Sequence, residues 1–147
     1  MSFADKTVIE AVREHLESTP APVGYALRKV HAYPPDNIAV APAAVIIPGD
    51  DTIAYGASNR QIALTLNVTI YVLPQADLAR KYEDLMTWRT WLRDAFIDGV
   101  TLDNASGVAQ ASVVGTSIGT DTWGDQDFLT ISASVEIACV EAIATSA

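Results

Sequence analysis

The stretch from Gln61 to Val72, which reads QIALTLNVTIYV, decides the fold. Apolar side chains occupy every even position from Ile62 to Val72, and the odd positions hold Gln, Ala, Thr, Asn and Tyr. Because successive side chains of a strand point to opposite faces, this period of two predicts a strand with one buried face and one polar face. Such a strand spans about 40 Å, which is long for a small domain, and Pro74 ends it.

A second long strand with the same alternation is predicted from Phe128 to Cys139, where the odd positions are apolar. The segment Val108–Ile118, rich in Val, Ser, Thr and Ala, precedes it as a further strand. The connection between them, Gly119–Asp127, is polar and contains two glycines. We expect a hairpin loop there, with Trp123 exposed.

Shorter strands are expected in the region from residue 19 to residue 60, which holds six of the seven prolines. Turn-forming residues divide this region, because proline and glycine interrupt regular structure. The expected short strands are Tyr25–Tyr33, Ala43–Ile47 and Ile53–Tyr55, with a turn at Pro48–Asp51 and a loop at Gly56–Asn59.

Two amphipathic helices are predicted. In the first, over about residues 3–18, apolar residues recur every four positions until Pro20 stops the helix. The second begins at Asp77, a good N-cap, and runs to Asp98. Trp88 and Trp91 cannot both occupy the centre of its apolar stripe. Either one of them reaches the outside as a partner contact, or both lie under the margin of the sheet.

The order of helix, several strands, helix and strand pair lacks the regular strand–helix alternation of parallel sheets. We therefore expect an α+β fold, with an antiparallel or mixed β-sheet that contains two long strands. An N-terminal helix and a central amphipathic helix flank this sheet. The length of 147 residues fits a single domain over residues 1–147.

The amino-acid composition argues against several classes of function. The chain has 18 acidic and 9 basic residues, a net charge of −9. So acidic a surface repels phosphate, which argues against binding nucleic acid or anionic membranes. No apolar run approaches the roughly 18 residues of a membrane-spanning helix. The single cysteine, Cys139, cannot form an internal disulfide and fits a reducing compartment.

The motifs that carry chemistry are weak. Gly115–Gly119 matches the nucleophile elbow of hydrolases around Ser117, but that elbow needs a helix after the serine and a histidine later in the chain. Both histidines, His15 and His31, lie upstream. The acids at 121, 125 and 127 lack the spacing of a calcium loop, and a solvated acidic loop is the simpler interpretation. We expect no catalytic residue, no cofactor and no metal.

The element order resembles a known family. An N-terminal helix over Phe3–Ser18 is followed by the Tyr33–Asp36 turn and the short segment Pro42–Gly49. The long strand ending in Val72-Leu73-Pro74, the helix from Asp77 to Asp98 and the final strand pair then follow. This pattern, over nearly the whole chain, resembles the tail terminator proteins of long-tailed, siphovirus-type phages, especially those of actinobacterial hosts.

The resemblance implies a structural virion protein, not an enzyme. Its subunits would form a homo-oligomeric ring, expected to be a hexamer, that caps the tail tube, stops tube polymerisation and joins the tail to the head connector or neck protein. The genome DNA would pass through without specific binding, and no membrane is involved. The location implied is the head-proximal end of the tail in the virion, after assembly in the host cytoplasm.

On this hypothesis the expected contacts with the partner or the lumen are Asp121, Trp123, Asp125, Asp127 and Trp91. Three alternatives stay open. The chain could be a neck or head-completion protein of the same virion, a small hydrolase that uses Ser117, or a monomeric binding module with no virion role.

Overall fold

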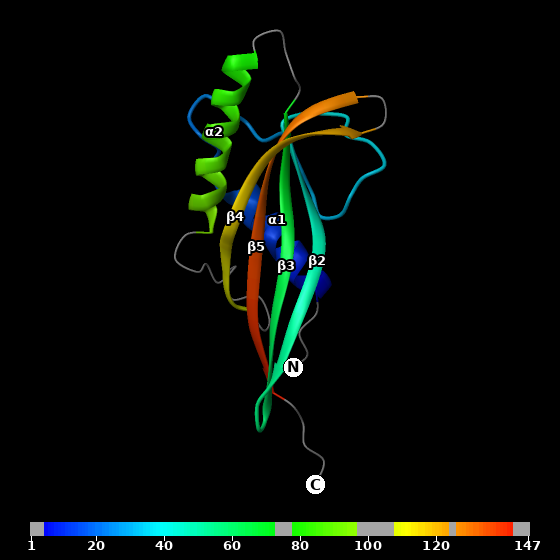
Figure 1. Ribbon diagram of the computed structural model, residues 1–147, viewed down its shortest axis with the longest axis vertical. Helices are drawn as coiled ribbons and strands as arrows, with labels where there is room; N and C mark the ends of the chain where they lie inside the picture. Colours follow the sequence, from blue (N-terminus) through cyan, green and yellow to red (C-terminus); the bar gives the residue numbers. More distant parts are fainter. Residues whose placement is uncertain (1–4, 73–77, 97–107, 124–125, 143–147) are drawn as a thin grey trace.

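The computed structural model describes residues 5–72, 78–96, 108–123 and 126–142. Two helices and five strands follow one another along the chain (Figure 1). They are α1 (Asp5–Ser18), β1 (Lys29–His31), β2 (Ala43–Tyr55), β3 (Asn59–Val72), α2 (Leu78–Ala95), β4 (Val108–Trp123) and β5 (Gln126–Ala142). The expected α+β class, with an N-terminal and a central helix, is confirmed.

The strands form a single mixed sheet in the order β1-β2-β3-β5-β4. β1 pairs with β2 in parallel, and every other neighbouring pair is antiparallel. The predicted strand Gln61–Val72 lies at the centre as β3, where Val68 is opposite Ile46 on one side and Ala133 on the other. Burial on the helix-covered face fixes this register, because a slip by one residue would turn the apolar set outward.

Two expectations about the shorter strands are wrong. Ala43–Ile47 and Ile53–Tyr55 are parts of one strand, β2, because a shift of register between Pro48 and Asp51 lets β2 pass the proline and resume its pairing with β3. The strand expected over Tyr25–Tyr33 is limited to β1. One reason is that the Tyr25 hydroxyl donates a hydrogen bond of 2.7 Å to Asp84 on α2, which holds this end of the segment away from the sheet.

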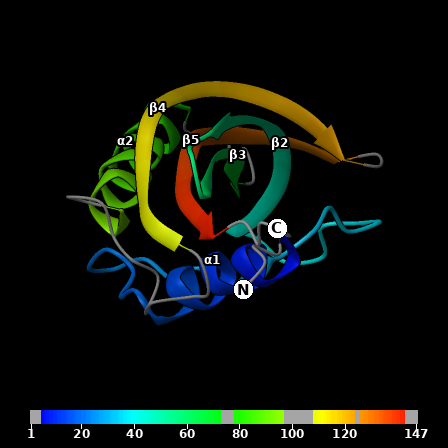
Figure 2. The ribbon, with the colours of Figure 1, turned by 90° about the horizontal axis from the view of Figure 1, so that it is seen from below.

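Both helices pack on one face of the sheet, where they bury the main core (Figure 2). α1 lies against β1 and β2, whereas α2 lies against β5 and β4. Val8, Val12 and Leu16 recur at helical spacing on α1 and are all buried, as the sequence predicted. The largest fully buried side chain of α2 is Trp88.

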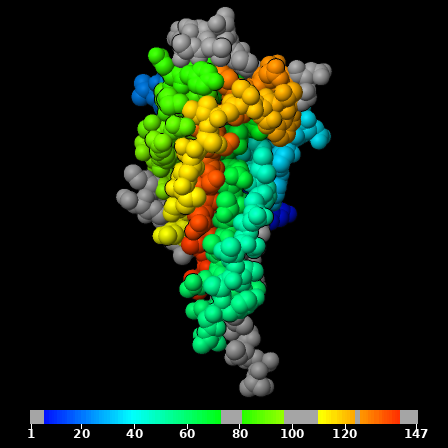
Figure 3. Space-filling model, in the orientation of Figure 1, coloured from blue at the N-terminus to red at the C-terminus, as the bar shows by residue number. Residues whose placement is uncertain are grey.

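The other face of the sheet is shown in the space-filling view, and neither helix covers it (Figure 3). A smaller apolar cluster, defined here as the second cluster, occupies one end of that face: Ile38, Ala43, Val45, Tyr71 and Phe128. Further along, the face is polar, and the Thr69 and Ser132 hydroxyls share a hydrogen bond of 2.9 Å across β3 and β5. Thr65, Asn67 and Ser134 continue this polar face.

The β2–β3 hairpin extends beyond the helices as an arm, defined here as residues Asp51–Gln61 (Figures 1 and 3). The side chains from Asp51 to Ser58 are exposed. The turn is closed by the Gly56 amide, which donates a hydrogen bond of 2.9 Å to the Asn59 carbonyl.

Candidate interaction surfaces

The acidic connection between β4 and β5 is mostly strand, so the loop expected over Gly119–Asp127 is wrong. β4 continues to Trp123, and β5 begins at Gln126, which is paired with it. The Thr122 hydroxyl donates to Asp127 at 2.8 Å and ties the two strands together. Asp127 is exposed at this end of the hairpin, whereas Asp125 lies outside the described residues.

Trp123 is half-buried, so the expectation of an exposed tryptophan is wrong. Its ring meets the Tyr71 ring edge-on, with the centroids 5.5 Å apart. Phe128 contacts Tyr71 in the same way at 5.7 Å. Aromatic pairs prefer this geometry, and it anchors the end of the hairpin on the second cluster. Only the remaining part of the Trp123 ring is available to a partner.

Asp121 also takes part in this anchoring. The buried Tyr71 hydroxyl donates to Asp121 Oδ2 at 3.2 Å, and the Thr122 amide donates to Oδ1 at 2.9 Å. Burial, and then the neighbouring carboxylate, raise the pKa of Tyr71 to about 12. Asp121 is itself exposed, so it combines a structural contact with a negative charge at the surface.

The two tryptophans of α2 both lie in the core, which decides between the two alternatives left open by the sequence. Trp91 is 7% exposed and meets Trp88 edge-on at 5.3 Å. Its indole N–H donates a hydrogen bond of 2.7 Å to the Pro20 carbonyl. Because its ring is buried and its donor is satisfied within the chain, Trp91 does not offer the outward contact expected of it.

Ser117 lies within β4, opposite Ser132, with strand on both sides. The helix that a nucleophile elbow requires after the serine is therefore missing at this position. His31 is on β1 at the opposite edge of the sheet. His15, on the helix-covered side, donates to the Ala95 carbonyl and packs against Phe96. Neither imidazole is placed to activate Ser117.

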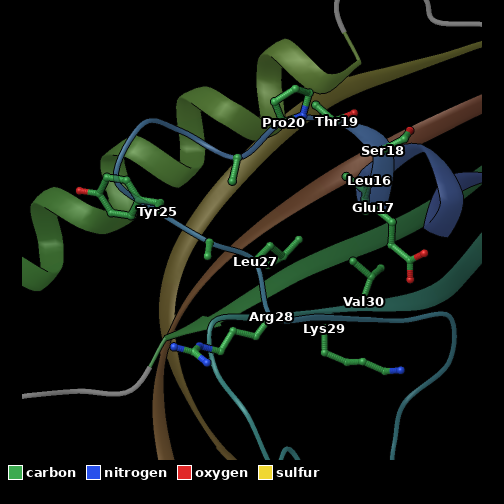
Figure 4. Close-up of a pocket in the computed structure, with 12 residues that line it drawn as sticks. Leu16, Glu17, Ser18, Thr19, Pro20, Tyr25, Leu27, Arg28, Lys29 and Val30 are labelled. Atoms are coloured by element: carbon green, nitrogen blue, oxygen red, sulfur yellow. The ribbon is translucent and has the colours of Figure 1, made fainter.

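A hollow of about 570 Å³ lies between the end of α1 and the segment that leads into β1 (Figure 4). Two contacts with α2 hold this segment in place, from Trp91 to the Pro20 carbonyl and from Tyr25 to Asp84. Gly24, with a φ of 85°, supplies the left-handed turn between them. Glu17, Arg28 and Lys29 lie at its wall, and the lining contains no histidine, cysteine or aspartate. Glu17 is the only carboxylate among these lining residues, so they offer no cluster of side chains that could hold a metal ion.

The sequence pattern does not reveal which apolar residues are exposed along the sheet edges. Val114 on β4 is 62% exposed, and Tyr55 on the arm is 71% exposed, with Ile53 half-exposed two residues before it. The alternating pattern identified these segments as strands, but strand order is a property of the tertiary fold. The available signal was the lack of charge from Val108 to Thr120, which is unusual for a strand open to solvent.

Neither a scan against models of known protein families nor a comparison with curated proteins finds a match to this chain. Within the described ranges, no helix is long and apolar enough to cross a membrane. The same residues contain no group of three or more His, Cys, Asp or Glu side chains that could hold a metal ion. Cys139 is buried, and its thiol donates to the Ile62 carbonyl at 3.3 Å, as expected of a core residue.

Proposed function

We propose that this chain is a structural subunit of a long-tailed phage or prophage virion, a tail terminator that assembles with its own copies into a ring, expected to be a hexamer. The ring caps the tail tube, stops tube growth and joins the tail to the head connector. The subunit performs no catalysis and needs no cofactor.

The observation that carries this proposal is the long edge strand β4, which is uncharged from Val108 to Thr120 and whose outer side pairs with no strand among the described residues, on a chain whose element order resembles that family. Monomeric proteins normally protect such an edge, whereas assemblies cover it. The net charge of −9 is compatible with DNA passage, because acidic walls repel phosphate and leave the DNA free to slide. In this proposal Asp121 and Asp127 face the lumen or an end of the ring.

The function is tested by tube polymerisation with the cognate tail-tube protein. Adding the purified chain should give shorter tubes, each with a ring at one end in electron micrographs. A neck protein would instead bind the head connector and leave tube lengths unchanged, so a parallel connector-binding assay separates the two. Tubes of unaltered length without terminal rings would contradict the proposal.

The role of the acidic hairpin is tested separately, by replacing Asp121, Asp125 and Asp127 with Asn in an infectious virion. If these acids keep DNA from adhering to the lumen, DNA ejection should slow while tail assembly continues, because the amides no longer repel phosphate. Unchanged ejection would remove the lumen assignment and leave the ring proposal intact.

A further inference from the structure

The two margins of the sheet leave backbone groups without a strand partner on opposite sides of the subunit. Among the described residues, β5 is the only strand that pairs with β4, so the outer side of β4 is open. At the other margin, β1 covers β2 only from Ala43 to Val45, and no described strand pairs with the outer side of β2 beyond that point.

The β4 margin is well suited to accept a strand. From Val108 to Thr120 it contains no charged residue and no proline, although solvent-facing edge strands usually carry such residues to prevent pairing. Its longest regular stretch begins at Gly115, just after a shift of register at Val114. Val114, Ser117 and Gly119 are exposed. In a chain of net charge −9, this neutral strip is a place where two copies can approach without direct repulsion.

The arm offers the complementary strand. Below the shift of register at Pro48–Asp51, the segment Thr52–Tyr55 is uncharged and exposed, and β3 pairs with its inner side only. Ile53 and Tyr55 project from the same face, since they are two residues apart on a strand. They are thus the apolar residues that an added strand would help to cover.

We propose that the outer edge of β4 in one subunit pairs with the outer edge of Thr52–Tyr55 in the next copy of this chain. This inference rests on the proposed ring and names the surfaces that build it. The contact joins two different patches, so it repeats head to tail. Contacts of this kind either close into a ring or continue as a filament, whereas a contact between identical patches stops at a dimer.

Strand direction supports the pairing. β2 and β3, β3 and β5, and β5 and β4 are each antiparallel, so β2 and β4 run in opposite directions within one sheet. Within one subunit the register across β3 and β5 places Thr52 level with Gln110, near the start of β4. A copy generated by rotation about an axis that is inclined to the strands is offset along them, so its arm reaches the middle of β4 of its neighbour and runs antiparallel to it. Antiparallel pairing is slightly more stable per residue than parallel pairing.

Two variants block one margin each, and each has a matched control. Val114→Lys places a charge on β4, and Val23→Lys makes the same change at a loop residue that is 100% exposed. Tyr55→Lys places a charge on the arm, and Tyr82→Lys makes the same change at an exposed tyrosine of α2. Native mass spectrometry should find rings for the wild type and both controls, and monomers for Val114→Lys and Tyr55→Lys.

Mixing the two blocked variants is the decisive step. Val114→Lys retains a working arm, and Tyr55→Lys retains a working β4 edge, so an equimolar mixture should form a one-to-one heterodimer and nothing larger. If Tyr55→Lys alone formed dimers, the contact would be between two β4 edges, and the proposal would be overturned. A mixture that stayed monomeric, or a wild type that never assembled, would also overturn it.

Circular dichroism of each variant separates lost assembly from lost folding. If Val114→Lys does not fold, Ser117→Lys replaces it, with Ser18→Lys at the end of α1 as its control. The outcomes also separate this inference from the proposed function. Rings that persist in both blocked variants would refute the edge contact but not the terminator role. Edge-dependent assembly that leaves tube length unchanged would refute the terminator role but not the contact.

Discussion

The two margins of the sheet differ in how they deal with solvent. Along β2, β1 covers the first three paired positions, and then Pro48, Asp50 and Asp51 follow at a shift of register. Along β4, no charge or proline appears until Asp121. Proline cannot donate a hydrogen bond to an added strand, and burying a carboxylate in such a contact is costly. The middle part of β2 is therefore poorly suited to pair with a further strand, whereas β4 is well suited to do so. An edge strand thus shows, in its own residues, whether it is adapted to water or to a partner.

The margins also rest on different helices, and this can be tested with a matched pair of substitutions. Leu16→Ala on α1 and Leu92→Ala on α2 each remove a fully buried leucine, and each should lower the free energy of unfolding by about 2–5 kcal/mol in urea titrations. Hydrogen exchange should then quicken mainly in β1 and β2 for Leu16→Ala, and mainly in β4 and β5 for Leu92→Ala. Equal acceleration in both halves would show that the margins open as one unit.

The C-terminal end of β4 is held to β3 by the hydrogen bond from Tyr71 to Asp121. We therefore expect the stability of the fold to fall at alkaline pH. The pKa of Tyr71 is raised from 10.0 to about 12, so between these pH values the unfolded chain releases the phenol proton while the folded chain keeps it. The free energy of unfolding should therefore fall as the pH rises through this range. Tyr71→Phe should flatten that part of the curve, as measured by denaturation at each pH. An unchanged slope would place the effect elsewhere.

Removing the two carboxylates at the shift of register in β2 should make this strand, like β4, better able to pair with another copy. Asp50→Ser combined with Asp51→Ser should strengthen self-association about tenfold, or ~1.4 kcal/mol, in sedimentation equilibrium. The control, Asp36→Ser with Asp94→Ser, makes the same change in net charge at exposed positions that are not part of β2. If the control had an equal effect, net charge rather than edge protection would govern association.

Salt should have the smallest effect. Copies with a net charge of −9 repel one another, and raising the ionic strength from about 0.01 M to about 0.1 M shortens the screening length from about 30 Å to about 10 Å. Wild-type association should therefore strengthen a few-fold over this range in light scattering. Weaker association at higher salt would instead indicate a contact dominated by opposite charges.

Secondary structure is predicted correctly where the spacing of apolar residues is regular over many positions. It is predicted wrongly where a single residue interrupts that spacing. The alternation from Ile62 to Val72 and the four-residue spacing from Val8 to Leu16 gave the correct element and the correct buried face. Pro48 predicts the end of a strand, because the sequence does not show that a shift of register between Pro48 and Asp51 lets the strand continue. The polar neighbours of Trp123 predict a position at the surface, whereas Tyr71, distant in sequence, covers part of its ring.

By itself, the sequence determined the class of the fold, the helix and strand periods and the acidic charge, because each depends on residues close together in the chain. Only the tertiary structure decided that β4 lies at one margin of the sheet and β1 with β2 at the other, that Trp91 faces inward, and that the β4–β5 hairpin rests on Tyr71. Those outcomes depend on which strands become neighbours, and strand order is set by packing between segments far apart in the chain. The sequence therefore shows that Val108–Thr120 lacks charge and proline. Only the strand order shows that this segment forms an edge of the sheet.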